Sequence, residues 1–569
     1  MRPRAGIVTG MCLLLLGVSG PDGAADATET DQALSRVYAN YALSALDGGR
    51  FEEARSFAET SLEFDEENAD AHHILARSLS DIQAETGRVV RHLEESVQAG
   101  GFRVTDGSDA RLLLAETYLR TDRASEALEV LEPPAVGAPQ AASTYLTARA
   151  LLDLGEVEEA EEAALRGRRL YPDDPRFVLF LLRRDSTPGP RTGRWLDANV
   201  SEDPAYLESL LYYAARVGDS RRALELTERY LELGGEDPRV AVIRARAAGE
   251  RSREEAWELF VRLDGLEDKS SVEEMYDLLP AGRVKDRVRA VLADYDGTAE
   301  RDEERDGFWE ERFVFSDGSL ERWEVDRNQD GVTEYEVVMS ARVPGSLETS
   351  PEGYRIRYGG YPEIDVVEVR DDDRLRRYRV LPGRLTYRIL SEDLDWGTDT
   401  PDAAFPFRLS REPPVLSEEL LRENAFRLEL GAPEGPVTRV RALEEGAVLG
   451  EVVDEDADGR IDHVIAYEEG ARVAGLRDAD HDGRFEVVEQ YEDDQLSLRL
   501  VDLDGDDTFE YRERLQPEAR VSWDYDGDGV IDAGELRVGR SEVLRQLSLG
   551  DDGDFETSMT IYREAVPNE

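Results

Sequence analysis

Hydrophobic residues recur three and four positions apart between about residues 31 and 294, which predicts a series of amphipathic helices. The helices come in pairs that repeat roughly every 34 residues. The clearest pair spans residues 141–174. Ala148 and Ala160 are small enough for its two helices to cross closely, and Pro172 ends the second helix. The first half of the chain is therefore predicted to be all-α.

Three further segments carry small residues at the same spacing. They are Ala42, Ala54 and Ala58 in residues 35–68, Ala115, Ala124 and Ala127 in the next copy, and Ala214 and Ala223 in residues 204–237. These residues resemble the tetratricopeptide repeat (TPR) family. The resemblance implies a right-handed superhelix whose concave groove binds a protein partner, with Leu112, Glu116, Tyr145 and Arg149 pointing into the groove. Residues 82–101 and 176–203 depart from the family pattern.

Beyond about residue 300 the hydrophobic period changes to two, which is typical of β-strands. Each repeat there consists of an acidic loop, a strand, a tight turn and a second strand, so stacked repeats are expected to form an antiparallel meander. The predicted fold class is α + β multidomain, an all-α TPR-like superhelix followed by an antiparallel β-repeat domain. The predicted segments are a signal peptide (1–27), a helical repeat domain (31–296), a first β-repeat block (300–400), a proline-rich insertion with a short helix at 417–427 (401–436) and a second β-repeat block (437–569).

Five acidic loops share one spacing: three acid or amide side chains at alternate positions, then in most copies glycine, then an acid three residues later. The candidate metal ligands are Asp326, Asn328, Asp330 and Glu334; Asp454, Asp456, Asp458 and Asp462; Asp478, Asp480, Asp482 and Glu486; Asp502, Asp504, Asp506 and Glu510; and Asp524, Asp526, Asp528, Val530, Asp532 and Glu535. Carboxylates this close repel one another unless a cation or protons intervene. Oxygen ligands around a glycine turn suit Ca²⁺, which takes about six to eight of them.

The last of these loops fits the EF-hand pattern in full. Its three alternating aspartates would ligate by side chain, Val530 by its carbonyl, Asp532 directly or through water, and Glu535 with both oxygens. The earlier loops depart from the pattern; two have Val337 and Ile465 at the position of that glutamate, and Asp507 replaces a glycine. The region is thus similar to EF-hand-type calcium loops set in β-repeats, as in thrombospondin or integrin-type repeats, and the resemblance implies weak Ca²⁺ sites. The alternative is ordinary hairpin-turn chemistry in an acidic protein.

The N-terminus has the pattern of a secretory signal. Arg2 and Arg4 precede an apolar run at 6–18, and small residues at 23–27 offer a cleavage site. The run is shorter than the roughly 20 residues that a spanning helix needs, and no later segment approaches that length. Cys12, the single cysteine, lies inside the run, so the mature chain would lack disulfides. We expect a cleaved Sec-type signal peptide, no integral membrane segment in the mature chain, and a periplasmic, secreted or cell-surface protein.

The formal net charge of −57 argues against nucleic acid and anionic membranes as partners, because both would be repelled. Three functions remain: an exported, non-enzymatic protein-interaction scaffold, an adhesin that binds carbohydrate or a cell surface through the β-repeats, and a carboxylate-based hydrolase. No serine elbow, phosphate-cradling glycine loop, histidine–metal spacing or nucleophilic cysteine is present, so no catalytic residue is assigned. His72 and His73 are interpreted as surface and packing residues.

Overall fold

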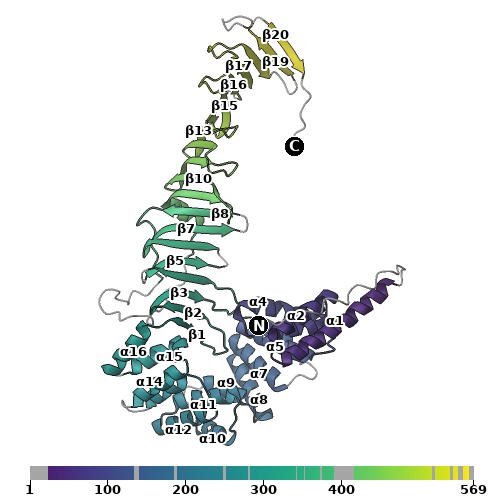
Figure 1. Ribbon diagram of the computed structural model, residues 1–569, viewed down its shortest axis with the longest axis vertical. Coiled ribbons are helices and arrows are strands. Elements are labelled where there is room, and N and C mark those ends of the chain that lie inside the picture. Colours follow the sequence, from purple (N-terminus) through teal and green to yellow (C-terminus); the bar gives the residue numbers. More distant parts are fainter. Residues whose placement is uncertain are drawn as a thin grey trace, which may run out of the picture. The chain divides into compact units, whose positions relative to one another are not determined.

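Helices occupy the chain up to Ala293, and antiparallel strands follow from Gly297 in the computed structural model (Figure 1), which confirms the predicted fold class. The chain divides into unit 1 (Met1–Asp317 and Val325–Thr333) and unit 2 (Gly318–Glu324 and Glu334–Glu569). The structure describes residues 23–132, 140–184, 189–247, 252–279, 282–340, 343–350, 353–371, 374–389, 415–515, 519–537, 542–548, 555 and 557–562. The predicted signal peptide therefore lies outside the described residues except for residues 23–27, which begin the first helix.

Unit 1 is built from helices, most of which pack on the next helix along the chain. They are α1 (Gly23–Asp47), α2 (Phe51–Phe64), α3 (Ala69–Leu79), α4 (Thr86–Ala99), α5 (Gly107–Arg120), α6 (Ala124–Leu131), α7 (Gln140–Asp153), α8 (Val157–Leu170), α9 (Pro175–Arg184), α10 (Pro190–Ala198), α11 (Pro204–Arg216), α12 (Ser220–Glu232), α13 (Arg239–Ala247), α14 (Ser252–Arg262), α15 (Lys269–Leu278) and α16 (Arg283–Ala293), with 3₁₀ turns η1 (Gln83–Glu85) and η2 (Gly265–Glu267). Residues 82–101 depart from the TPR sequence pattern, yet they form η1 and α4, and α4 packs on α3.

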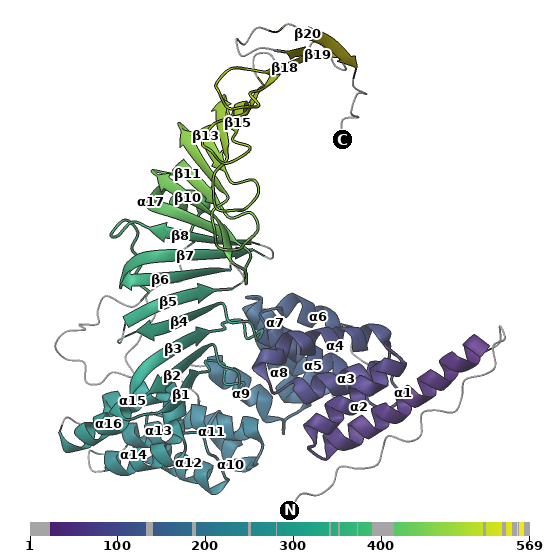
Figure 2. The ribbon, with the colours of Figure 1, turned by 45° about the horizontal axis from the view of Figure 1, so that its top comes forward.

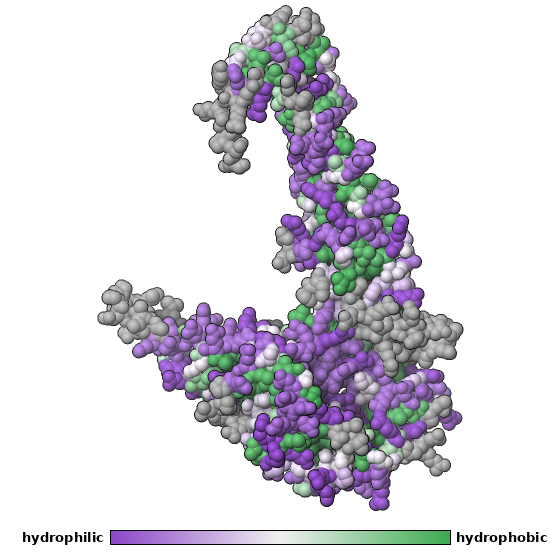
Figure 3. All heavy atoms as spheres, turned by 180° about the vertical axis from the view of Figure 1, so that it is seen from behind, coloured by the Kyte–Doolittle hydropathy of each residue, from purple (hydrophilic) through white to green (hydrophobic). Residues whose placement is uncertain are grey.

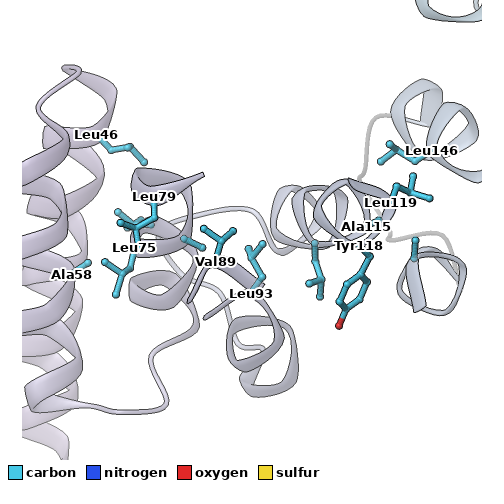
Figure 4. Close-up of a cluster of buried hydrophobic side chains, with 14 of the residues drawn as sticks. Leu46, Ala58, Leu75, Leu79, Val89, Leu93, Ala115, Tyr118, Leu119 and Leu146 are labelled. Atoms are coloured by element: carbon cyan, nitrogen blue, oxygen red, sulfur yellow. The ribbon is translucent and has the colours of Figure 1, made fainter. Parts of the chain in front are cut away.

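The small residues that the repeat pattern places at helix crossings are buried. Ala148 and Ala160 are both 0 % exposed. Between the pairs, larger side chains such as Leu75, Val89 and Tyr118 form a continuous core (Figure 4). Burial of such side chains contributes about 1.5–3 kcal/mol each to stability. Each pair thus stacks on its neighbours through an apolar face that it cannot bury alone, as a repeat array requires.

Unit 2 is an antiparallel meander, in which consecutive strands pair. The strands of the chain are β1 (Gly297–Arg301) and β2 (Glu311–Ser316) in unit 1, then β3 (Ser319–Val325), β4 (Tyr335–Ser340), β5 (Val343–Thr349), β6 (Tyr354–Gly360), β7 (Glu363–Asp371), β8 (Arg374–Val380), β9 (Ala425–Gly431), β10 (Val437–Glu444), β11 (Ala447–Val453), β12 (His463–Glu468), β13 (Ala471–Arg477), β14 (Val487–Glu492), β15 (Gln495–Val501), β16 (Tyr511–Arg514), β17 (Arg520–Trp523), β18 (Ala533–Arg537), β19 (Glu542–Leu547) and β20 (Thr557–Tyr562).

The predicted proline-rich insertion contributes a strand to this sheet. Its helix α17 (Glu418–Asn424) begins after Ser417, whose side chain accepts from Leu420 N–H, and is shorter than the predicted 417–427. Residues from Ala425 onward instead form β9, which pairs with β8 and β10. Backbone pairing with a strand on each side outweighs the helical tendency of the preceding residues. The two β-repeat blocks are therefore one sheet, and residues 390–414 lie outside the described part.

The apolar and charged rows of the sheet exchange faces at the step from β9 to β10. Residues in cross-strand register along one face are Val337, Leu347, Ile356, Val367, Tyr378 and Leu428, continuing as Arg441 and Glu451. The other face carries Glu348, Arg355, Glu368, Arg377 and Glu429, continuing as Val440, Val452, Val464, Leu476, Val488 and Leu500. Because a strand has a period of two, pairing Leu428 with Arg441 is enough to exchange the rows.

The helical packing predicts that two glycine-to-alanine substitutions in unit 1 have different effects on stability. A Cβ at Gly167 in α8 would overlap the ring of Phe177, whereas Gly87 in α4 has open space around the same position. We expect Gly167→Ala to destabilise unit 1 by about 1–3 kcal/mol through overpacking. Gly87→Ala should be neutral or stabilise it by up to about 1 kcal/mol. Thermal unfolding followed by helical circular dichroism measures both, and equal shifts would contradict the α8–α9 packing.

Candidate functional site: acidic loops and a helical groove

The five acidic loops adopt one backbone hydrogen-bond pattern. In each, the backbone N–H at the glycine position donates to the first carboxylate. These bonds run from Gly331 to Asp326 at 3.1 Å, Gly459 to Asp454 at 2.9 Å, Gly483 to Asp478 at 2.8 Å, Asp507 to Asp502 at 2.9 Å and Gly529 to Asp524 at 2.8 Å. The first carboxylate of each loop is thus held by the loop's own backbone.

Two left-handed residues give each loop its sharp reversal. The glycine position has a positive φ, such as 98° at Gly483, and Asp507 keeps the same region at 72°. The residue two places earlier is also left-handed in every copy, for example 62° at His481. Asp tolerates this conformation better than most residues, which explains why the fourth loop keeps its shape without the glycine.

The fourth acid of each unit 2 loop folds back over the loop. Asp462 accepts from Glu455 N–H at 2.6 Å, and Asp532 accepts from Tyr525 N–H at 2.6 Å. The Glu455 N–H holds the pKa of Asp462 below its ordinary value. Glu486 and Glu510 make the equivalent bonds to the backbone N–H of residues 479 and 503. Every second connection between these strands is an acidic loop. The loops therefore lie at the same end of the strands, along one side of the sheet (Figure 2).

The loops bring carboxylate oxygens close enough to share a cation. One oxygen from each of Asp502, Asp504, Asp506 and Glu510 lies within 4.8 Å of the others. Asp506 raises the pKa of Asp504 through like-charge repulsion. The first three aspartates of the second and third loops converge in the same way. A hard divalent cation would relieve this repulsion, and oxygen donors are the ligands that Ca²⁺ takes.

Glu535 does not lie with the loop that the EF-hand pattern assigns it to. It belongs to β18, and it accepts from Arg545 Nε at 2.7 Å across the sheet. Glu489, at the same place in the third copy, likewise pairs with Arg499 at 3.3 Å. The strand begins too soon after the loop for the twelfth residue to fold back. The fourth acid, Asp532 in the last loop, instead folds back and accepts from Tyr525 N–H, and Val530 N–H donates to Asp528 at 2.8 Å.

The first loop is part of unit 1 rather than of the sheet unit. Asp326 is 1 % exposed and accepts from Gln83 Nε2 at 2.7 Å, across 243 residues of sequence. Gln83 also pairs with both backbone groups of Trp309, at 2.8 and 2.9 Å. Gly331 lies so close to Gln83 O that a side chain there would collide with it. Glu334, the predicted fourth acid of this loop, falls in unit 2.

A segment that follows the helices packs onto their first-helix side. The Arg120 guanidinium of α5 stacks on the Phe308 ring at 3.7 Å, and Arg183 of α9 donates to the Glu304 carbonyl at 3.2 Å. A cavity of ≈ 490 Å³ remains, lined among others by Tyr145 and Arg149 of α7. Part of the groove is therefore occupied by the chain itself, a contact that the repeat pattern did not reveal.

A second cavity of ≈ 360 Å³ lies between α5 and α7. Its lining includes Leu112, Glu116 and Tyr145, and Arg149 lines the neighbouring cavity. The four residues that the TPR resemblance placed in the groove thus face these two cavities. Arg176 at the rim stacks near Tyr145, 5.6 Å from its ring centre, and pairs with Asp174.

His72 and His73 are buried rather than at the surface. They are 6 % and 1 % exposed. Burial lowers the pKa of His73 to about 4, and its Nδ1 lies 3.1 Å from Thr105 Oγ1. His72 meets His92 of the next helix, with 3.0 Å between their Nδ1 atoms. Sequence reasoning missed His92, because the fold of the α3–α4 hairpin alone brings it to His72.

The second β-repeat block leaves one apolar face half exposed. A shallow cavity of ≈ 360 Å³ there is lined by residues that include Phe426, Val440, Val452 and Val464. Figure 3 shows hydrophobic residues gathered between hydrophilic ones along the strand-rich part of the chain. This face continues the row that is charged in the first block. It offers an apolar surface within unit 2.

Comparison with known proteins supports the helical half. The family described as anaphase-promoting complex, cyclosome, subunit 3, matches residues 102–166, which include α5 to α7 and most of α8. Unit 1 is thus a TPR-like helical repeat region.

An uncharacterized protein of Treponema pallidum (strain Nichols) is 24 % identical over 386 residues, which cover 56 % of this chain. The chain spans about half the length of this curated relative, 48 %.

Solved structures with similar folds include YrrB, described as a TPR protein with an unusual peptide-binding site (15 % identity, 39 % of this chain and 96 % of that chain, TM-score 0.23). They also include yeast Tom70 (12 %, 48 % and 55 %, TM-score 0.29) and the Cut9–Hcn1 heterotetramer of APC/C (13 %, 47 % and 61 %, TM-score 0.29). TM-scores this low carry no argument about this chain. Among the described residues, no helix is both long and apolar enough to span a bilayer.

Glu310 predicts a pH dependence for unit 1. Burial raises its pKa from an ordinary value of 4.5 to about 8. A carboxyl with a raised folded pKa contributes stability below its unfolded pKa and loses it as the pH rises through the folded pKa. The melting temperature of unit 1 should therefore fall between about pH 5 and about pH 9, and Glu310→Gln should flatten that fall. Glu258→Gln, an exposed site in α14, is the control, and an unchanged slope in Glu310→Gln would contradict the prediction.

Proposed function

We propose that the protein is an exported, non-enzymatic scaffold that binds a protein partner through the helical groove and carries a β-repeat unit stabilised by Ca²⁺. The observation that carries the proposal is the groove cavity between α5 and α7, with its apolar floor and charged rim. Protein interfaces combine an apolar core with a polar rim. Glu116 is exposed there, Leu112 and Tyr145 supply the apolar walls, and Arg77 and Arg176 add positive charge.

The Ca²⁺ part of the proposal rests on the shared loop geometry. Loops of one spacing hold their carboxylates close together through one hydrogen-bond pattern, although mutual repulsion opposes that arrangement. Extracellular Ca²⁺ modules bind at about 10⁻⁴–10⁻³ M, which fits loops with exposed outer aspartates. Export rests on the N-terminal sequence pattern. The ion pairs between Glu and Arg on neighbouring strands form without a metal. Ca²⁺ would therefore order the acidic loops rather than create the fold.

Groove binding is tested with peptides selected from a displayed library against the full chain. We expect Leu112→Ala with Glu116→Arg to weaken the selected peptides at least about tenfold, about 1.4 kcal/mol, because the pair removes an apolar contact and reverses one rim charge. Fluorescence anisotropy with labelled peptides measures the affinity.

The control for that experiment is Glu162→Arg, which makes the same charge change at an exposed position of the second helix α8. The selected peptides should bind this variant as tightly as they bind the wild type. An equal loss of peptide affinity in both variants would show a general effect of charge and would contradict binding in the groove. Glycan binding by unit 2 with no peptide binding would favour the adhesin instead.

Calcium is tested on the full chain after removal of divalent ions. Millimolar Ca²⁺ should raise the melting temperature of the strands, because an ion bound only by the folded loops stabilises them. Asp524→Ala with Asp526→Ala should lower the calorimetric stoichiometry by one site. Mg²⁺ should do less, since it demands a tighter octahedral shell.

The matched control is Asp493→Asn, an exposed turn aspartate at a hairpin between β14 and β15. The substitution removes one charge outside the five acidic loops. The number of Ca²⁺ ions that this variant binds should therefore equal that of the wild type. No heat and no melting shift at several millimolar Ca²⁺ would leave the loops as hydrogen-bonded turns of an acidic protein.

A further inference from the structure

Three side-chain atoms of α3 and α4 that can ligate a metal converge in unit 1. His72 Nδ1 lies 3.0 Å from His92 Nδ1 and 3.2 Å from Glu95 Oε2, and His92 Nδ1 lies 3.4 Å from the same oxygen. His92 and Glu95 stand three residues apart in α4, on one helix face. The loops and the groove described above contain none of these residues.

The hydrogen bonding of His72 fixes which of its nitrogens has a free lone pair. His72 Nε2 lies 2.8 Å from the Glu66 carbonyl oxygen, which can only accept, so Nε2 carries the hydrogen. In a neutral His72 ring, Nδ1 therefore directs a lone pair at the other two atoms. Metal-bound histidines commonly donate their second N–H to a carbonyl in this way, which orients the ring.

A hydrogen bond between the rings explains only part of this arrangement. If both rings are neutral, one hydrogen at most, on His92 Nδ1, lies among the three atoms. Glu95 Oε2 then faces the lone pair of His72 at 3.2 Å with no hydrogen between them. A cation at the centre would satisfy all three atoms at once.

The three separations match one face of a tetrahedral zinc site. Zinc bonds of about 2.0–2.1 Å to nitrogen and about 2.0–2.2 Å to oxygen give ligand–ligand edges of about 3.3 Å in a tetrahedron. The observed edges are 3.0, 3.2 and 3.4 Å. Calcium would be a poor match, because it prefers oxygen ligands in a larger shell.

Burial gives the site a fixed inner part and an open outer part. The side chains of His72 and His92 are 8 % and 11 % exposed, so packing holds both rings. The Glu95 side chain is 47 % exposed, which leaves a path to solvent and room for a water. Two imidazoles and one carboxylate are a common donor set for zinc.

We propose that His72, His92 and Glu95 bind one Zn²⁺ ion, with water in the fourth position, and that the ion ties α3 to α4. The donors belong to one helix pair of the array, so the ion would stabilise that repeat beside the groove-lining helix α5. The site is independent of the acidic loops and of the partner that the groove binds.

The test is titration of the full chain with Zn²⁺ and Co²⁺ after removal of divalent ions, with millimolar Ca²⁺ present to compete at the oxygen sites. We expect one tight site for zinc and a visible absorption band of tetrahedral Co²⁺ that zinc displaces. Glu95→Gln should weaken zinc at least about tenfold, because loss of even an outer-shell partner of a zinc site costs about 10–100-fold. His92→Gln should abolish the cobalt band.

Two controls keep the outcome specific. His481→Asn removes the histidine that lies 3.1 Å from Asp462 in a second possible donor cluster, and it should leave the tight site unchanged. Glu59→Gln changes an exposed carboxylate of the same array, and it should also leave the site unchanged. Circular dichroism shows that each variant folds, and Glu95 is exposed enough for its variant to do so. Absence of the cobalt band in the wild type, or a band that His481→Asn removes, would overturn the proposal.

Discussion

The hydrogen bonds that aspartates accept from their own loop backbone are the interaction on which the β-repeat unit depends. In a chain with a net charge of −57, the first aspartate is nevertheless buried in four of the five loops, for example 2 % exposed at Asp478 and 4 % at Asp524, and half-buried in the loop of Asp454. An unpaired buried carboxylate would be far too costly. Backbone N–H groups at the glycine position and nearby neutralise that cost, as at Gly483 and Asp482. The loop's own backbone therefore holds its shape.

Buried carboxylates on the strands also need partners, which explains the rows of arginine across the sheet. Glu368 and Glu429 bracket Arg377 at 2.7 and 3.1 Å, and Glu489 and Glu513 bracket Arg499 at 3.3 Å each. Each arginine is shared by two acids on neighbouring strands. These rows lie on opposite faces of the sheet in the two blocks, so each block turns its apolar row to the other side. Opposite charges directly across strands stabilise a sheet that has little core on its charged face.

Unit 1 obeys a different constraint, the close crossing of helix pairs through small residues. It stacks repeats through a shared apolar core, and its groove is partly covered by residues 302–310 and by the first acidic loop. Gln83 fixes that loop by donating to Asp326 and by bonding both backbone groups of Trp309. The cavity between α5 and α7 shares Tyr145 with the neighbouring cavity, which residues of this segment line.

The sequence by itself determined the local features of this protein. Helical period, small crossing residues and turn prolines predicted the repeat array, and the period-two pattern with acidic loops predicted the meander, because these signals arise between near neighbours in the chain. Only the tertiary structure decided which distant residues meet. Gln83 reaches Asp326 across 243 positions, His72 lies beside His92 of the next helix, and Glu535 belongs to a strand and pairs with Arg545 instead of folding over the last acidic loop. The register of β9 on β10 decided which face of each block is apolar. None of these pairings produces a periodic pattern in the sequence, because each depends on how separate elements pack.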